Sequence, residues 1–137
     1  MRWKLRGGKL VWHSDAKYRI DWNRGAPSKG AQAVKDFIRR HFSNDLWMEE
    51  YRLPRCLLRV DFLNATRKFA IEFNGPQHEG FVKHFHRDRV GYAASFGRDL
   101  AKAEFLEGNG YKLVEIREDD LPLSVDFFVK AGVWCNK

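Results

Sequence analysis

The chain has 137 residues, of which 44% are hydrophobic and 15% aromatic, and its net charge is +7. This length is typical of one compact domain with its own core, and the composition excludes a disordered or collagen-like chain. No apolar run approaches the roughly 20 residues that cross a bilayer, so no membrane association is expected. The basic N-terminus lacks the apolar run of a signal peptide, so none is expected, and Cys56 and Cys135 form no metal-binding motif. We therefore expect reduced thiols in a cytoplasmic protein.

Positive charge is concentrated in the first 40 residues, which hold eleven Lys or Arg and three Asp or Glu, a net +8. Aromatic residues such as Trp3, Trp12 and Trp22 are interleaved with these charges. Cations that contact phosphates beside rings that stack on bases are typical of nucleic-acid binding, whereas the alternative is a solvated basic face. The expected phosphate contacts are Arg2, Lys4, Arg6, Lys9, Arg24 and Lys29.

Residues 1–25 are predicted to form short strands and turns. The elements expected after them are a helix over 29–41 capped by Ser28, strands over 46–53, 56–63 and 67–74, a helix over 93–107, a strand over 111–116, and a last helix from Ser124 to about Ala131. The second and third strands are separated by a short turn and are predicted to form a hairpin. This order of helices and strands predicts an α/β domain around a mixed sheet.

Two carboxylates lie on the predicted hairpin. Strand alternation places Val60 and Phe62 on one face and Asp61 on the other, and Glu72 lies on the polar face of the next strand. Mg²⁺ prefers hard oxygen ligands, commonly one or two carboxylates with water and substrate phosphate. The pair therefore predicts a Mg²⁺ site for phosphodiester chemistry, with Mn²⁺ as a substitute ion and the carbonyl of Phe73 as a further ligand. The alternative is that both acids face solvent and pair with neighbouring cations.

Further polar residues follow the second carboxylate. His78 is a candidate general acid or base, and Gln77 a candidate for positioning water. Asn74 is an active-site candidate that also suits a turn with Gly75. Lys102 is predicted either to stabilise charge on the phosphate or to form a surface ion pair with Asp99.

The segment 79–92 is basic and aromatic, as expected for a loop that contacts DNA. Its expected DNA contacts are Lys83, Arg87 and Arg89. Zinc binding by His78, His84, His86 and a cysteine is an alternative.

Several motifs occur in order along residues 28–121. They are Val60-Asp-Phe62, Ile71-Glu-Phe-Asn-Gly75, His78, Lys102 and Gly110-Tyr-Lys-Leu-Val-Glu-Ile116. In this order they resemble the PD-(D/E)xK nuclease superfamily, in the branch of very-short-patch-repair-like and phage homing endonucleases. The resemblance implies a restriction-endonuclease-like mixed sheet flanked by helices, over residues 28–137. It implies Asp61 and Glu72 as metal ligands, with His78 and Lys102 as active-site polar groups. Residues 1–27 fall outside it and are expected to be a basic DNA-contacting extension.

The chain departs from the superfamily pattern at two positions. The usual Lys, two residues after the Glu, is Asn74 here, so Lys102 or His78 is expected to replace it. The usual carboxylate at the start of the first helix is absent, since Ala31 follows Gly30. The acids that remain as candidates for this role are Asp36, Glu49 and Glu50.

Together these features predict a Mg²⁺-dependent endonuclease for double-stranded DNA in the cytoplasm of a bacterium or a phage-infected host cell. The preferred subtype is a site-specific homing endonuclease of a phage or mobile element, while restriction, mismatch repair and junction resolution remain open. Double-strand cleavage by one site per chain predicts a homodimer or higher homo-oligomer. The alternative is a non-catalytic RNA- or DNA-binding module of the same fold, similar to RAP domains, which have a similar Ile-Glu-x-x-Gly-Pro-x-His stretch.

Overall fold

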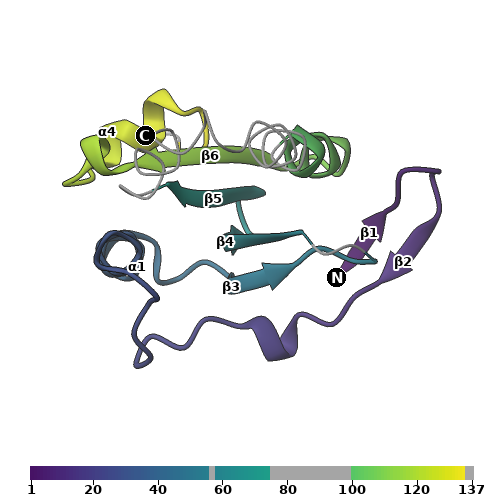
Figure 1. The fold of residues 1–137 in the computed structure, drawn as a ribbon, viewed down its shortest axis with the longest axis horizontal. Helices are drawn as coiled ribbons and strands as arrows, with labels where there is room; N and C mark the ends of the chain where they lie inside the picture. Colours follow the sequence, from purple (N-terminus) through teal and green to yellow (C-terminus); the bar gives the residue numbers. More distant parts are fainter. Residues whose placement is uncertain (56–57, 75–99, 135–137) are drawn as a thin grey trace, which may run out of the picture.

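The computed structural model describes residues 1–55, 58–74 and 100–134. Within them, a four-stranded sheet has the order β3-β4-β5-β6, and β1 and β2 form a separate two-stranded sheet (Figure 1). The strands are β1 (Arg2–Lys4), β2 (Leu10–Trp12), β3 (Trp47–Arg52), β4 (Arg59–Asn64), β5 (Phe69–Asn74) and β6 (Lys112–Arg117). The pairs β3–β4 and β4–β5 are antiparallel, and β5–β6 is parallel. The predicted α/β class, the mixed sheet and the β4–β5 hairpin are confirmed.

One face of the four-stranded sheet is covered by α1 (Lys29–Phe42) and α4 (Val125–Lys130). The predicted caps of both helices are confirmed, since the hydroxyls of Ser28 and Ser124 accept backbone N–H groups at 3.1 and 3.3 Å. Apolar side chains from both helices and all four strands form one buried cluster on this face, which we call the α1 face. Its buried members are Val34, Phe37, Ile38, Phe42, Trp47, Phe62, Phe69, Ile71, Val114, Ile116 and Phe128.

The opposite face, which we call the hairpin face, is covered by the β1–β2 hairpin and by helical residues 100–108. Trp3 and Leu106 pack there against buried residues of β3, β4 and β5. The indole N–H of Trp3 donates to the hydroxyl of Tyr51 at 2.9 Å. The N-terminal strands therefore share a hydrophobic core with the sheet. In the described residues, no helix is long and apolar enough to span a membrane.

The expected alternation of side chains fails in the middle of β3 and β4. On β4, Val60 packs on the hairpin face, whereas Phe62 packs on the α1 face. On β3, Met48 and Tyr51 share the hairpin face although they are three residues apart. The prediction that Val60 and Phe62 lie on the same face is therefore wrong.

The cause is a local distortion at one position of the strand pair. The register joins Glu49 to Phe62 and Tyr51 to Val60, so Glu50 and Asp61 lie opposite each other between these pairs. Glu50 has a φ of 48°, which L-residues adopt rarely and which interrupts the pleat. Both strands change faces at this point.

Candidate active site

Asp61 lies where β4 and β5 stop pairing. The last paired residues of these two strands at this end are Phe62 and Ile71. Just beyond them, Oδ2 of Asp61 accepts the backbone N–H of Phe73 at 2.8 Å. If the strands had stayed paired, a backbone carbonyl of β4 would accept this N–H, and the Asp61 carboxylate takes its place. The hydrogen bond to β5 therefore holds the carboxylate in position.

Glu72 contacts a lysine that lies 30 residues further along the chain. The ammonium of Lys102 donates to Oε1 of Glu72 at 3.0 Å, and the side chain of Lys102 is 9% exposed. Leu106, one helical turn later, is buried on the hairpin face, so residues 100–108 direct Lys102 towards β5. The structure therefore brings Lys102 to Glu72, while Asp99, its alternative partner, lies outside the described residues.

The environment disfavours the ionised form of both carboxyls. Burial raises the pKa of Glu72 to about 7, the charge of Asp61 acts in the same direction, and Lys102 opposes both. Burial also raises the pKa of Asp61, whereas the hydrogen bond from the Phe73 N–H and the charge of Lys102 act to lower it. Oε2 of Glu72 is buried and has no hydrogen-bond partner among the described residues. A bound cation would stabilise such a pair of carboxylates.

A third carboxylate lies beside this pair. Glu50 is opposite Asp61, and its charge contributes to the raised pKa of Asp61. Both residues line a cavity of about 240 Å³ between the sheet and the start of α1. The other lining residues are Pro27, Ser28, Ala31, Glu49, Phe62 and Phe73. Asp36, Glu49 and Glu50 are the candidates for the missing first-helix carboxylate. Glu49 and Glu50 line this cavity, and of these two only Glu50 forms no ion pair with another described residue.

The other two acids have different surroundings. Glu49 is buried, and both its oxygens lie 3.0 Å from the ammonium of Lys35, with Arg24 at 3.3 Å. Asp36 accepts a hydrogen bond from the amide of Gln32 at 2.9 Å on the exposed side of α1. The buried Lys35–Glu49 pair was not anticipated, because Lys35 reads as a surface position in the sequence.

Asn74 is held by the neighbouring strand β6. Its side-chain amide donates to Oε1 of Glu115, which also lies 3.6 Å from Nε of Arg117. The parallel register places Glu115 beside Glu72. Glu115 and Arg117 were not among the predicted site residues, although the predicted strand over 111–116 and its alternation were an available signal for Glu115.

The remaining predicted residues fall into two groups. His78, Gln77, Lys83, Arg87 and Arg89 lie outside the described residues. Among the predicted DNA contacts within the described ranges, Arg24 contacts Glu49, and the others are exposed: Arg2, Lys4, Arg6, Lys9 and Lys29. Within the described ranges, no group of three or more His, Cys, Asp or Glu residues is arranged to hold a metal.

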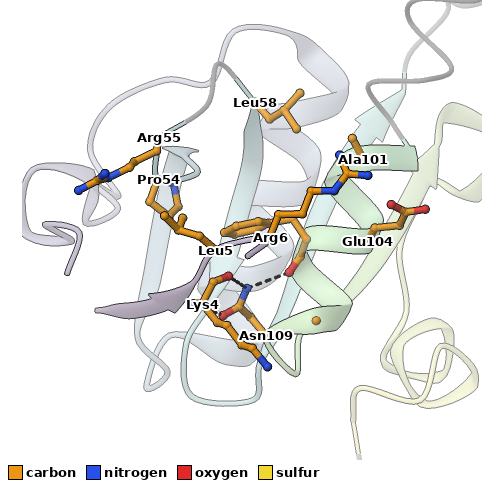
Figure 2. A pocket seen from close by; sticks show the side chains of 11 residues that line it. Lys4, Leu5, Arg6, Pro54, Arg55, Leu58, Ala101, Glu104 and Asn109 are labelled. Carbon is orange, nitrogen blue, oxygen red and sulfur yellow. Dashed lines mark hydrogen bonds between the residues drawn. The ribbon is translucent and has the colours of Figure 1, made fainter. Parts of the chain in front are cut away.

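A larger cavity of about 510 Å³ lies between the end of β1, the residues Pro54, Arg55 and Leu58, and the helical residues 100–108 (Figure 2). Lys4, Arg6 and Arg55 bring positive charge to it, and Ala101 lines it next to Lys102 in sequence. The side chain of Asn109 fixes one wall, donating to the carbonyls of Lys4 and Phe105 at 3.1 and 2.9 Å. This basic cavity therefore adjoins the helix that carries Lys102.

Comparison with known proteins gives two relatives with limited coverage. Over 59 residues the chain is 30% identical to the uncharacterized protein 307L of Invertebrate iridescent virus 6. Over 59 residues it is 34% identical to the uncharacterized protein 033L of Invertebrate iridescent virus 3. In each case the match covers 43% of this chain and 30% of the viral protein. No protein-family model and no solved structure matches the chain. These relatives are similar in sequence and indicate no activity.

Proposed function

We propose that this chain is a Mg²⁺-dependent DNA endonuclease with a restriction-endonuclease-like fold, and that Asp61, Glu72 and Lys102 form its active site. One observation carries the proposal: a buried ammonium lies 3.0 Å from one of two carboxylates on adjacent strands, where those strands stop pairing. The order α1, β3, β4, β5, helical residues 100–108 and β6 supports it, since the motif resemblance implied this arrangement.

The donor atoms suit a hard divalent cation. Oε2 of Glu72 is buried without a partner among the described residues, and Asp61 is held in place by Phe73. Asp61 and Glu72 would hold the ion, with water, substrate phosphate and the Phe73 carbonyl as further ligands. When bound, Mg²⁺ would activate water and offset negative charge on the scissile phosphate.

The protein side chains have separate roles in this proposal. Lys102 places its side-chain amine 3.0 Å from Glu72, where it would offset the charge that develops on the phosphate. Asn74 stands at the position of the usual lysine, and Glu115 holds its amide. His78 and Gln77 lie close to Glu72 in the sequence. His78 is proposed to transfer a proton and Gln77 to position water.

Exposed cations on the N-terminal strands favour a polyanionic substrate, and double-stranded DNA is the proposed one. A homodimer would bring one site to each strand of the duplex. A site-specific homing endonuclease of a phage or mobile element is the proposed subtype, on the motif resemblance.

Cleavage of supercoiled plasmid in Mg²⁺ tests the proposal. Asp61→Asn and Glu72→Gln should each abolish nicking while they retain DNA binding, and EDTA should stop the wild-type enzyme. Asp126→Asn is the matched control, because Asp126 is an exposed acid of α4 that pairs with Lys130. Wild-type-like cutting by both site variants would remove the proposed active site. Tight binding with no cutting in Mg²⁺ or Mn²⁺ would favour the non-catalytic binding module.

A further inference from the structure

The two faces of the β1–β2 hairpin differ in chemistry. Trp3 and Val11 point into the core and are 1% and 7% exposed. Their neighbours on β2, Leu10 and Trp12, point outward and are 55% and 80% exposed. Trp12 therefore leaves most of its indole in water, where it gains little from packing within the chain.

The core-facing side holds this exposed side chain in a fixed direction. Trp3 is buried and bonded to Tyr51, and the N-terminal ammonium and the carbonyl of Met1 each bond to His13 at 2.8 Å. Because successive strand residues point to opposite faces, the burial of Val11 requires Trp12 to project outward. The hairpin thus presents Trp12 from a rigid support.

The outer face also carries uncompensated positive charge. Cross-strand pairing places Arg2 beside Trp12 and Lys4 beside Leu10. Residues 1–14 contain four cations, Arg2, Lys4, Arg6 and Lys9, and no Asp or Glu. None of these four side chains forms an ion pair with an acid in the described ranges. Each outward apolar side chain therefore has a cation at its side.

We propose that this outer face binds nucleic acid, that Arg2 and Lys4 contact backbone phosphates, and that Trp12 stacks on a base outside the regular duplex stack. Aromatic side chains in a basic groove stack on bases of any sequence, and cations beside them bind the connecting phosphates. Two exposed apolar side chains give little area for a membrane surface, whose binding grows with buried apolar area. The inference rests on the proposed function in taking DNA as the ligand.

The stacking role predicts a substrate preference. A fully paired duplex hides both faces of each internal base, whereas a gap or single-stranded segment exposes them. DNA with a short single-stranded gap should therefore bind more tightly than the intact duplex of the same length. The same gap made of abasic nucleotides keeps the phosphates and should lose this advantage.

Fluorescence anisotropy with the three labelled DNAs, in EDTA, tests this without any cleavage. Trp12→Ala should weaken binding to the gapped DNA about tenfold and leave the intact and abasic DNAs nearly unchanged, while Trp12→Phe retains most of the affinity. Leu100→Ala is the control, because Leu100 is also exposed, at 53%, but lies on another element. Thermal unfolding should be unchanged in all three variants.

The charged residues are tested in the same assay. The double variant Arg2→Ala and Lys4→Ala should weaken binding to all three DNAs and flatten its salt dependence, since fewer counterions are released. The pair Arg39→Ala and Arg40→Ala on exposed positions of α1 is the charge-matched control.

Equal affinity of wild type and Trp12→Ala for gapped DNA would overturn the proposal. So would Trp12-dependent binding to anionic phosphatidylserine vesicles in place of DNA. Failure of the active-site proposal would appear instead in the plasmid assay, which does not depend on this result.

Discussion

The ammonium of Lys102 lies 3.0 Å from Oε1 of Glu72, and the side chains of both residues are mostly withdrawn from water, at 9% and 23% exposure. This contact joins a helix to β5 across 30 residues of sequence. Removing one member of a buried ion pair leaves the other charge without compensation. Substitutions at these two residues therefore probe stability and the proposed catalysis together.

Lys102→Ala should lower the single-turnover rate of DNA cleavage by about 10²–10³, because a donor that offsets charge in the transition state is lost. DNA affinity in EDTA should change little. Adding Asn74→Lys to this variant should restore part of the rate, since it places a lysine two residues after Glu72, where the PD-(D/E)xK pattern has one. A rate close to that of the wild type would limit Lys102 to a structural role.

The stability of the metal-free protein should depend on pH through Glu72. The pKa of Glu72 is about 7 in the folded protein against an ordinary value of 4.5, so the folded state holds this proton more tightly. Its stabilising contribution is complete below about pH 4.5 and is lost as the pH rises through 7. Between pH 5 and 8, the wild type should lose more melting temperature in EDTA than Glu72→Gln does. Circular dichroism melts measure this, and parallel curves would contradict the raised pKa.

The caps and most boundaries of the described elements follow from local signals in the sequence. Ser28 and Ser124 begin their helices as predicted, because capping depends on a side chain and a backbone group three residues apart. The sequence left two alternatives open for Lys102, an active-site position and a surface pair with Asp99, and it did not predict the contact with Glu72. The break in alternation at Glu50 and Asp61 could not be predicted from the sequence, because it depends on how two paired strands distort together.

The buried pair of Lys35 and Glu49 provides a stability test that needs no cleavage assay. Their side chains are 1% and 3% exposed. Glu49→Leu should cost about 3–5 kcal/mol in the free energy of unfolding, because the Lys35 ammonium remains buried without its charged partner and keeps only the carbonyl of Arg24 as an acceptor. Adding Lys35→Met should recover much of this loss. Urea denaturation measures both variants, with Lys130→Met, at an exposed ion pair, as the control expected to change stability by less than about 1 kcal/mol. Equal losses in the single and double variants would contradict the expectation.

Gly30 controls the packing of Phe73, whose backbone N–H binds Asp61. A Cβ at Gly30 would lie 2.0 Å from the ring of Phe73, so the ring would have to move. Gly30→Ala should therefore lower both the melting temperature and the cleavage rate. Gly108→Ala is the matched control, since it also adds a methyl group to a helix but has no neighbouring atom within 4 Å. If Gly30→Ala were as stable and active as that control, Phe73 would not position Asp61.

The link between Trp3 and Tyr51 has a consequence for where the proposed enzyme would cut. Tyr51 follows Glu50 in β3, and Glu50 lies opposite Asp61, so the hairpin is anchored to the sheet one residue from the Glu50–Asp61 position. A base held by Trp12 and the bond at the carboxylates would then contact one rigid body. The structure of the protein would then set the distance between the stacked base and the cleaved bond. Mapping of cut positions on gapped DNAs should give a constant offset from the gap.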